Sequence, residues 1–232
     1  MNLLALDTST NRAAIALLVA TGQVSATTTE ASRRHGRDLI PRVSSLLAEG
    51  GLRAVDLDVV AVGLGPGSYT GLRVGVTAAK TLAYVTGAAL LGLDSLEVVG
   101  RNAPPEVLRV SVLGDAQRGE VYVADLQRPA AGAPLRPVRE SHIEPLSAWL
   151  DRLESGVYVL GPGLESPRIR SALPPGLIAD DPALNYPQGR HLIEMASEVY
   201  SSGHRENPWL VEPRYLRRSA AEDQWNTRPL VP

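Results

Sequence analysis

The chain has 232 residues, a formal net charge of −2 at pH 7 and no cysteine. Its 44% hydrophobic and 21% charged residues are typical of a globular protein and exclude a disordered or fibrous chain. The lack of cysteine excludes disulfides and thiolate metal sites, and the near-neutral charge disfavours sequence-independent binding of nucleic acid by this chain alone.

The N-terminal segment MNLLALDTST carries no basic residue, and its apolar run is too short for a secretory signal. No stretch approaches the roughly 20 apolar residues that are needed to cross a bilayer. We therefore expect a cytoplasmic protein without a membrane segment.

Three strand-like runs open the chain, at residues 3–6, 13–19 and 24–29, and turn-forming residues separate them. They predict an antiparallel three-stranded meander. The segment 33–51 (RRHGRDLIPRVSSLLAEGG) then places apolar residues at helical spacing. It predicts an amphipathic helix with Asp38 as a candidate N-cap.

A buried strand is predicted at residues 58–64, and a glycine-rich loop follows it. Next come a helix at 71–85, a strand at 89–93 and a short helix at 96–102. This order of strands and helices makes a complete α/β unit.

Residues 102–105, NAPP, mark a boundary. Beyond it a second hairpin is predicted, with strands at 107–113 and 120–126, and a helix is predicted at 191–200. The second half of the chain reads as a degenerate, loop-rich repeat of the first.

These boundaries predict three parts. The first is an N-terminal lobe at residues 1–103, and the second is a smaller C-terminal lobe at 104–205. The third is a C-terminal segment at 206–232.

The loop GLGPGSYTG resembles a phosphate-binding turn, but it lacks the glycine-lysine pattern of a P-loop and the third glycine of a dinucleotide fingerprint. Gly65 and Gly67 permit a tight turn from strand to helix, and Ser68 or Thr70 can cap that helix. Arg73 in the first turn opposes the helix dipole unless an anion or a carboxylate offsets it. A structural turn with a surface arginine is favoured slightly over phosphate binding.

Small residues recur every four positions along the predicted helix, at Gly71, Gly75, Ala79, Ala83 and Gly87. Glycine inside a helix costs about 1 kcal/mol relative to alanine, so close approach of another backbone is indicated. Packing on the chain's own sheet is the favoured explanation for this stripe. The remaining apolar side chains then cover another surface, and one candidate is a neighbouring subunit.

The first hairpin turn carries Asp7, Thr8 and Ser9. These residues either hold nucleotide phosphates and magnesium or simply close the hairpin as an Asx or ST turn. The turn DAQRGEVY (115–122) has the same two interpretations. Two such hairpins resemble those of actin, sugar kinases and Hsp70-type ATPases, in which an Asp-x-Gly-Thr pattern clasps phosphates. Here Ser9 replaces the glycine, which argues against ATP chemistry.

Five segments, in order along nearly the whole chain, resemble the bacterial TsaB family, also called YeaZ. They are LALDTST, RRHGRDLIP, VGLGPGSYTGLRVGVTAAKTLA, DAQRGEVY and PRYLR. The resemblance implies a duplicated ribonuclease H-like fold of the ASKHA class, an α/β fold of two lobes with mixed sheets flanked by helices.

The resemblance also implies membership of the machinery that adds a threonylcarbamoyl group to the adenosine next to the anticodon of tRNA. In that machinery TsaC makes threonylcarbamoyl-AMP and the metal-containing TsaD transfers the group. TsaB pairs with TsaD through N-domain helices, and the ATPase TsaE joins them. The expected partners are thus TsaD and TsaE, a second copy of this chain when TsaD is absent, and tRNA only indirectly.

One departure from TsaD bears on activity. TsaD has a His-His-x-Glu-Gly-His pattern where this chain reads DSLEVV (94–99), so Ser95 and Val99 occupy the places of the ligand histidines. Valine cannot ligate a metal and serine is a poor ligand. We therefore expect no catalytic residue, no metal and no cofactor, and a partner subunit rather than an enzyme.

The resemblance places the partner-binding surface on the predicted 71–85 helix. The candidate contacts are Gly71, Val74, Gly75, Thr77, Ala78 and Leu82. The PRYLR motif is expected to pack back on the scaffold through Tyr215 and Leu216, with Arg217 in an ion pair, and residues 219–232 are expected to form a poorly ordered tail. An active ASKHA-type ATPase or small-molecule kinase is the alternative, and a metallopeptidase is a weaker one.

Overall fold

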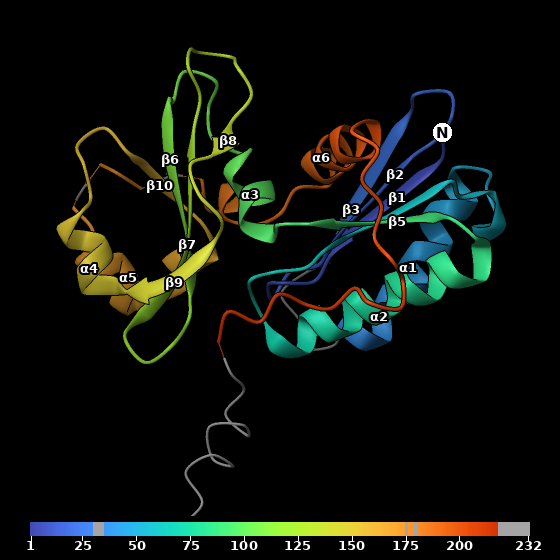
Figure 1. Cartoon of the computed structure of the whole chain (residues 1–232), viewed down its shortest axis with the longest axis horizontal. Coiled ribbons are helices and arrows are strands. Elements are labelled where there is room, and N and C mark those ends of the chain that lie inside the picture. The colour runs from blue at the N-terminus through green and yellow to red at the C-terminus, as the bar shows by residue number, and fades with distance from the viewer. Residues whose placement is uncertain (30–34, 175, 179–180, 218–232) are drawn as a thin grey trace, which may run out of the picture.

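The computed structural model describes residues 1–29, 35–174, 176–178 and 181–217. They form two lobes, each built on a β-sheet flanked by helices (Figure 1). The N-terminal sheet has the order β3-β2-β1-β4-β5. Its strands are β1 (Leu3–Asp7), β2 (Ala14–Leu18), β3 (Val24–Thr28), β4 (Val59–Gly63) and β5 (Ala89–Leu93).

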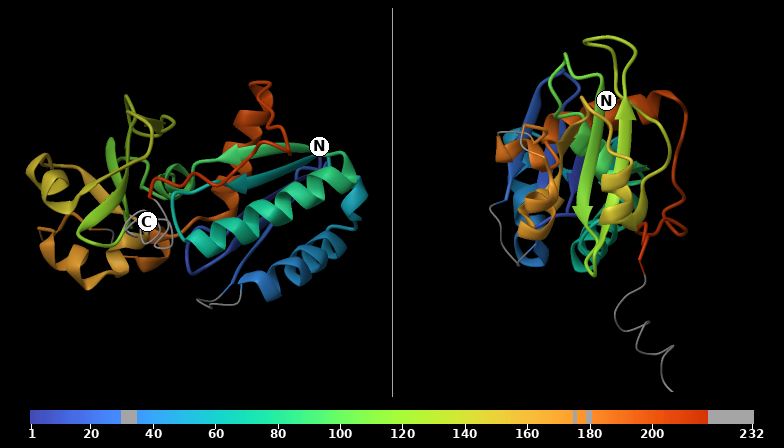
Figure 2. Two further views of the ribbon diagram at one scale, coloured as in Figure 1. Left: turned by 60° about the horizontal axis from the view of Figure 1, so that its bottom comes forward. Right: turned by 90° about the vertical axis from the view of Figure 1, so that its left-hand side faces the viewer.

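The first three strands are antiparallel, whereas β4 and β5 run parallel to β1. The predicted meander and both later strands are therefore confirmed. The helices α1 (His35–Glu49) and α2 (Tyr69–Thr86) cover one face of this sheet (Figure 2). Asp38 lies inside the first turn of α1, so its prediction as the N-cap was wrong.

The opposite face of the N-terminal sheet is covered by α6 (Gly189–Ser201). This helix was predicted to belong to the C-terminal lobe. Leu192 and Ala196 of α6 are fully buried in one apolar cluster with Leu3 and Ala5 of β1. The predicted lobe boundary at residue 205 was therefore wrong. An amphipathic pattern shows that a helix has a buried face, but it does not show which sheet that face covers.

The C-terminal sheet has the order β10-β6-β7-β8, and β9 also pairs with β7. Its strands are β6 (Arg109–Asp115), β7 (Glu120–Gln127), β8 (Arg136–Pro137), β9 (His142–Pro145) and β10 (Tyr158–Leu160). The other elements of this half are α4 (Leu146–Asp151), η2 (Pro162–Glu165), α5 (Pro167–Ala172) and η3 (Pro182–Asn185). In the first half, η1 (Ala54–Asp56) precedes β4, and α3 (Ser95–Gly100) follows β5.

The second sheet repeats the centre of the first. The hairpin β6–β7 with β10 parallel to β6 matches the hairpin β1–β2 with β4 parallel to β1. The predicted repeat is confirmed, and the protein has a two-lobed, ribonuclease H-like fold. Between the lobes, α3 buries Leu96 and Val99 against the C-terminal sheet and Val98 against the N-terminal sheet.

After α6 the chain runs back along α2 toward the space between the lobes (Figure 2). The amide of Glu206 donates to the carbonyl of Leu90 (2.8 Å), and the amide of Arg214 donates to the carbonyl of Leu64 (2.7 Å). The predicted tail at 219–232 lies outside the described residues. Among the helices of the described part of the chain, none is both long and apolar enough to span a membrane.

Candidate functional site: the cleft between the lobes and the outer face of α2

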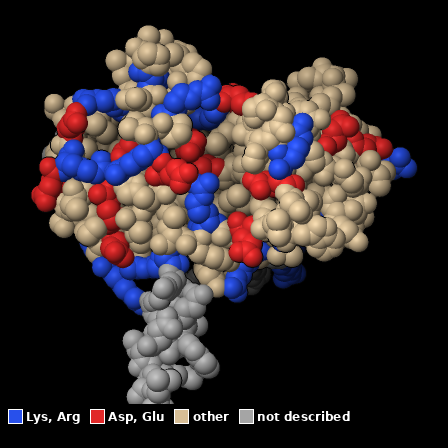
Figure 3. Space-filling model, viewed as in Figure 1, with Lys and Arg blue, Asp and Glu red and all other residues tan. Residues whose placement is uncertain are grey.

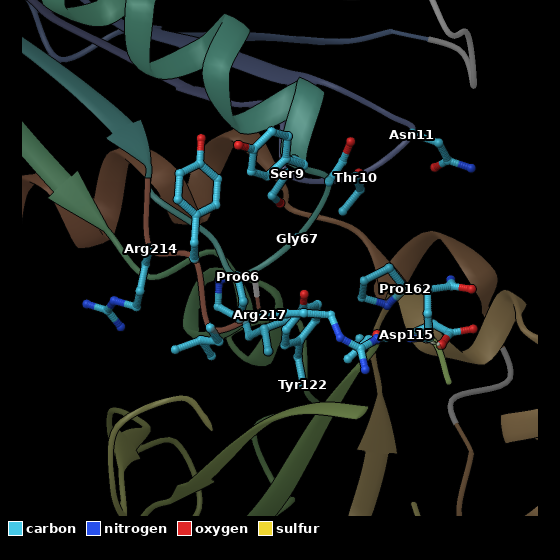
Figure 4. A pocket seen from close by; sticks show the side chains of 18 of the residues that line it. Ser9, Thr10, Asn11, Pro66, Gly67, Asp115, Tyr122, Pro162, Arg214 and Arg217 are labelled. Atoms are coloured by element: carbon cyan, nitrogen blue, oxygen red, sulfur yellow. Dashed lines mark hydrogen bonds between the residues drawn. The ribbon is translucent and has the colours of Figure 1, made fainter. Parts of the chain in front are cut away.

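A cleft of about 650 Å³ lies between the lobes. The first hairpin turn, the glycine-rich loop, the β6–β7 turn and the C-terminal segment line it (Figure 4). The side chains labelled in Figure 4 come from all four of these segments, as well as from η2. In position, the cleft corresponds to the predicted phosphate-binding turns.

Of the three candidates in the first hairpin turn, Asp7, Thr8 and Ser9, only Ser9 is among the lining residues of this cleft. Asp7 and Thr8 are completely buried. The Asp7 carboxylate accepts a hydrogen bond from the Ser9 amide (2.7 Å) through Oδ1, while Oδ2 has no hydrogen-bond partner. Desolvation raises the pKa of Asp7, although the Ser9 amide and the nearby hydroxyls of Ser9 and Ser95 favour the charged form and oppose that rise. Asp7 and Thr8, predicted as phosphate-loop candidates, are therefore buried and do not line the cleft.

The first hairpin turn is instead occupied by the chain's own glycine-rich loop. The amide of Ser68 donates to the carbonyl of Ser9 (2.7 Å). A Cβ placed on Gly67 would approach that same carbonyl oxygen to less than 3.0 Å, so glycine is required there. The Ser68 hydroxyl accepts from the Gly71 amide (3.2 Å), which confirms Ser68 as the N-cap of α2.

The small-residue stripe of α2 packs on the chain's own sheet, as predicted, and on the first hairpin turn. Thr8 donates through Oγ1 to the carbonyl of Gly71 (2.7 Å). A Cβ on Gly71 or on Gly75 would approach an oxygen of Thr8 to less than 3.0 Å. Because both glycines are buried against the hairpin, their assignment to a partner-binding surface is corrected. Ala79 and Ala83 continue the buried stripe.

The other predicted contacts lie nearer the surface. Val74, Ala78 and Leu82 are half-buried along the side of α2 that packs against the apolar core, and Thr77 is exposed. We define the outer face of α2 as the exposed Thr77 and Thr81 together with their half-buried neighbours Val74 and Ala78.

The acidic side chains at the β6–β7 turn bind groups of this same chain. The Asp115 carboxylate accepts from the Gln117 amide (2.8 Å) and from the Arg168 guanidinium (3.0 Å). Arg217 donates to the carbonyl of Ala116 and forms an ion pair with Glu120. The predicted ion pair of Arg217 is therefore confirmed, and it joins the C-terminal segment to the C-terminal lobe.

Arg73 also has partners within the chain. Its Nε donates to the Tyr215 hydroxyl (3.1 Å), its guanidinium donates to the Tyr69 hydroxyl, and it lies over the Tyr69 ring. The two tyrosine rings lie 4.6 Å apart. This confirms that Tyr215 anchors the PRYLR motif, and aromatic groups rather than a carboxylate hold the arginine.

The segment 94–99, where the chain departs from the TsaD pattern, makes hydrogen bonds with other parts of the fold. Asp94 caps α3 by accepting from the amides of Leu96 (2.9 Å) and Glu97 (3.0 Å), and its Oδ2 accepts from Arg214 (2.7 Å). The Ser95 hydroxyl accepts from the Gly65 amide (3.1 Å). Across the described residues, His, Asp and Glu form no cluster of three or more that could hold a metal ion.

A smaller cavity of about 320 Å³ lies on the α3–α6 side of the interlobe contact, and Glu97, Arg136 and Glu198 are among its lining residues. Arg101 binds Glu198 through two bonds of 2.8 Å, and Arg136 binds it at 3.2 Å. Desolvation and the nearby Asp94 raise the pKa of Glu97 to about 7. Elsewhere acidic and basic side chains alternate over the face shown in Figure 3.

Comparison with known proteins places this architecture in a family. The TsaB protein of Bacillus subtilis, named for tRNA threonylcarbamoyladenosine biosynthesis, is 31% identical to this chain, and the match covers 97% of this chain and 98% of the relative. The chain belongs to the TsaB family. The Escherichia coli TsaB protein is 28% identical, with 99% of each chain covered.

A crystal structure from Pseudomonas aeruginosa, described as similar to the peptidase YeaZ, superposes with a TM-score of 0.79. It is 26% identical, and the match covers 93% of this chain and 99% of that chain. The family model of TsaD, the tRNA N6-adenosine threonylcarbamoyltransferase, matches residues 23–133. That range includes the glycine-rich loop, α2 and α3, so the TsaB-family chain shares its central scaffold with the transferase family.

Proposed function

We propose that this chain is a non-catalytic subunit of tRNA threonylcarbamoyladenosine biosynthesis, and that it supports threonylcarbamoyl transfer by pairing with TsaD through the outer face of α2. In this proposal TsaE joins the pair, and tRNA is reached only through the complex. Without TsaD the same face joins two copies of the chain. The pairing takes place in the cytoplasm.

One observation carries the proposal. The turn that would cradle a phosphate is filled by the chain's own loop, because Ser68 hydrogen-bonds to the carbonyl of Ser9 and Gly67 packs against it. Asp7, the carboxylate that would serve ATP chemistry, is completely buried behind this contact. A scaffold whose first hairpin turn is used for packing is suited to presenting a surface.

The outer face of α2 is suited to close helix contact because its exposed side chains are small. Thr77 and Thr81 are exposed, and the hydroxyl of Thr81 is already bonded to the carbonyl of Thr77 (2.8 Å). A partner helix can therefore approach without leaving the hydroxyl donor of Thr81 unpaired. On its buried side the helix is hydrogen-bonded to Thr8 of the first hairpin turn, so the face is held rigid.

Calorimetric titration with TsaD tests the pairing. Thr77→Arg places a long charged side chain in the middle of the face and should weaken TsaD binding at least tenfold, which corresponds to about 1.4 kcal/mol. Ser201→Arg is the matched control, because Ser201 is exposed at the end of α6 on the opposite side of the sheet. Equal affinities for the wild type and Thr77→Arg would rule out this face as the TsaD interface.

The alternative of an active ATPase has its own test. ATP turnover by the isolated wild-type chain, lost in a folded Asp7→Asn variant, would replace the scaffold role by an enzymatic one. We expect no turnover above the protein-free background, because the carboxylate is sealed from the cleft.

A further inference from the structure

Large apolar side chains lie exposed at the C-terminal end of α2. This apolar cluster consists of Tyr84, Val85, Trp209 and Leu210, which are exposed by 65%, 70%, 71% and 74%. The rings of Tyr84 and Trp209 meet edge to face, with centroids 5.1 Å apart. A monomer that exposes several such groups together usually does so at an interaction site.

The exposed area is large enough to matter for binding. If a whole aromatic side chain has about 150 to 250 Å² of surface, the two rings alone expose on the order of 200 to 340 Å². One partner in a standard interface contributes roughly 800 Å². The two rings would therefore supply a quarter to two fifths of one side, and Trp and Tyr are the residues that most often dominate binding energy.

Trp209 and Leu210 are displayed on a hydrogen-bonded turn. The amide of Trp209 donates to the side-chain oxygen of Asn207 (2.9 Å), and the amides of Leu210 and Val211 donate to the Asn207 carbonyl (2.9 and 3.0 Å). Val211 is buried, and its carbonyl accepts from the Lys80 ammonium (3.0 Å). Val211 thus holds the turn against α2. Little conformational entropy would therefore be lost when the two exposed side chains of the turn bind a partner.

The apolar cluster continues the outer face of α2. Thr77 and Thr81 are one helical turn apart, and Tyr84 and Val85 follow Thr81 after three and four residues, which places all four on one side of the helix. The C-terminal segment meets this side of α2 through the contact of Trp209 with Tyr84. The small face and the apolar cluster therefore form one continuous surface.

On the basis of the TsaD pairing argued above, we propose that the apolar cluster is the anchor of that interface, and that TsaD meets it with an uncharged, apolar surface. None of the four side chains of the cluster is charged, so a charge seated on them would lose its water without gaining a counter-charge from them. The C-terminal segment thus acts in partner binding and not only in closing the cleft.

Calorimetric titration of TsaD with the full chain tests this role of the segment. Trp209→Ala should raise the dissociation constant at least tenfold, and Leu210→Ala about fivefold. Leu108→Ala is the matched control, because Leu108 is a leucine exposed by 45% in the C-terminal lobe, and it should change the constant by less than about twofold. Thermal unfolding of each variant verifies that the fold is intact.

Three results would overturn the inference, and they separate it from the proposed function. If Thr77→Arg weakens TsaD binding while both cluster variants bind like the wild type, the pairing stands and the anchor does not. If neither Thr77→Arg nor Trp209→Ala weakens binding, both are wrong. If Trp209→Ala abolishes self-association in sedimentation velocity but leaves TsaD affinity unchanged, the occupant of the cluster is a second copy of the chain.

Discussion

The contact between α2 and the first hairpin makes a quantitative prediction for Gly71→Ala. The added Cβ would approach the carbonyl oxygen of Thr8 to less than 3.0 Å and its carbon to 3.2 Å. Thr8 lies directly after β1 and is completely buried, so its backbone has little room to move and α2 must shift away from the hairpin turn. This strains the hydrogen bond from Thr8 Oγ1 to Gly71.

The expected change in the free energy of unfolding combines three terms. Overpacking costs about 1 to 3 kcal/mol, and loss of the hydrogen bond costs about 1 kcal/mol. The better helix propensity of alanine returns about 1 kcal/mol. The variant should therefore be less stable by about 1 to 3 kcal/mol, which lowers the melting temperature by roughly 2 to 12 °C for a chain of this size.

Urea unfolding followed by circular dichroism measures this change directly. Thr77→Ala, on the exposed side of the same helix, is the control and should stay within about 0.5 kcal/mol of the wild type. If Gly71→Ala matches or exceeds the wild type in stability, the close approach of α2 to Thr8 does not constrain the fold, and our reason for the glycine is refuted.

Two further predictions concern Glu97 of α3 and Arg217 of the C-terminal segment. The folded-state pKa of Glu97 is raised from 4.5 to about 7, so the fold favours the protonated form. The protonated Glu97 side chain contributes to the free energy of unfolding below about pH 4.5, and this contribution is lost as the pH rises to about 7. Glu97→Gln should therefore gain stability relative to the wild type between pH 5 and 8 in urea unfolding, and a constant difference across that range would contradict the assigned pKa. Arg217→Ala removes the bonds to Ala116 and Glu120 and should lower the free energy of unfolding by about 1 kcal/mol. Arg205→Ala is its control, because Arg205 contacts only its own segment and Tyr200 among the interactions of the described residues.

Much of the fold could be predicted because hydrophobic periodicity reports local structure. The strand at 89–93 was predicted to the residue, and Ser68 was a predicted cap for α2. The prediction that α6 belongs to the C-terminal lobe failed because its apolar face could cover either sheet. The sequence pattern does not indicate which sheet it covers. The short strands β8 and β9 escaped prediction because two to four residues show too little periodicity.

The candidate site shows the same limit. Asp7 and Thr8 have side chains that can hold a nucleotide's magnesium and phosphates, and their type suggested a role in ligand binding. Their burial depends on how closely Gly67 and Gly71 bring the loop and α2 onto the hairpin, which is a tertiary fact. The role of Arg214 in capping the α3 terminus through Asp94 was also missed, although the PRYLR motif was the signal for it.

Nucleoside mass spectrometry of tRNA tests the scaffold role most directly. The tRNA would be incubated with threonine, bicarbonate, ATP, TsaC, TsaD and TsaE, with and without this chain. We predict that threonylcarbamoyladenosine forms only when the chain is present, and that the chain without TsaD forms none. Equal modification in its absence would show that this TsaB-family chain is not the supporting subunit proposed here.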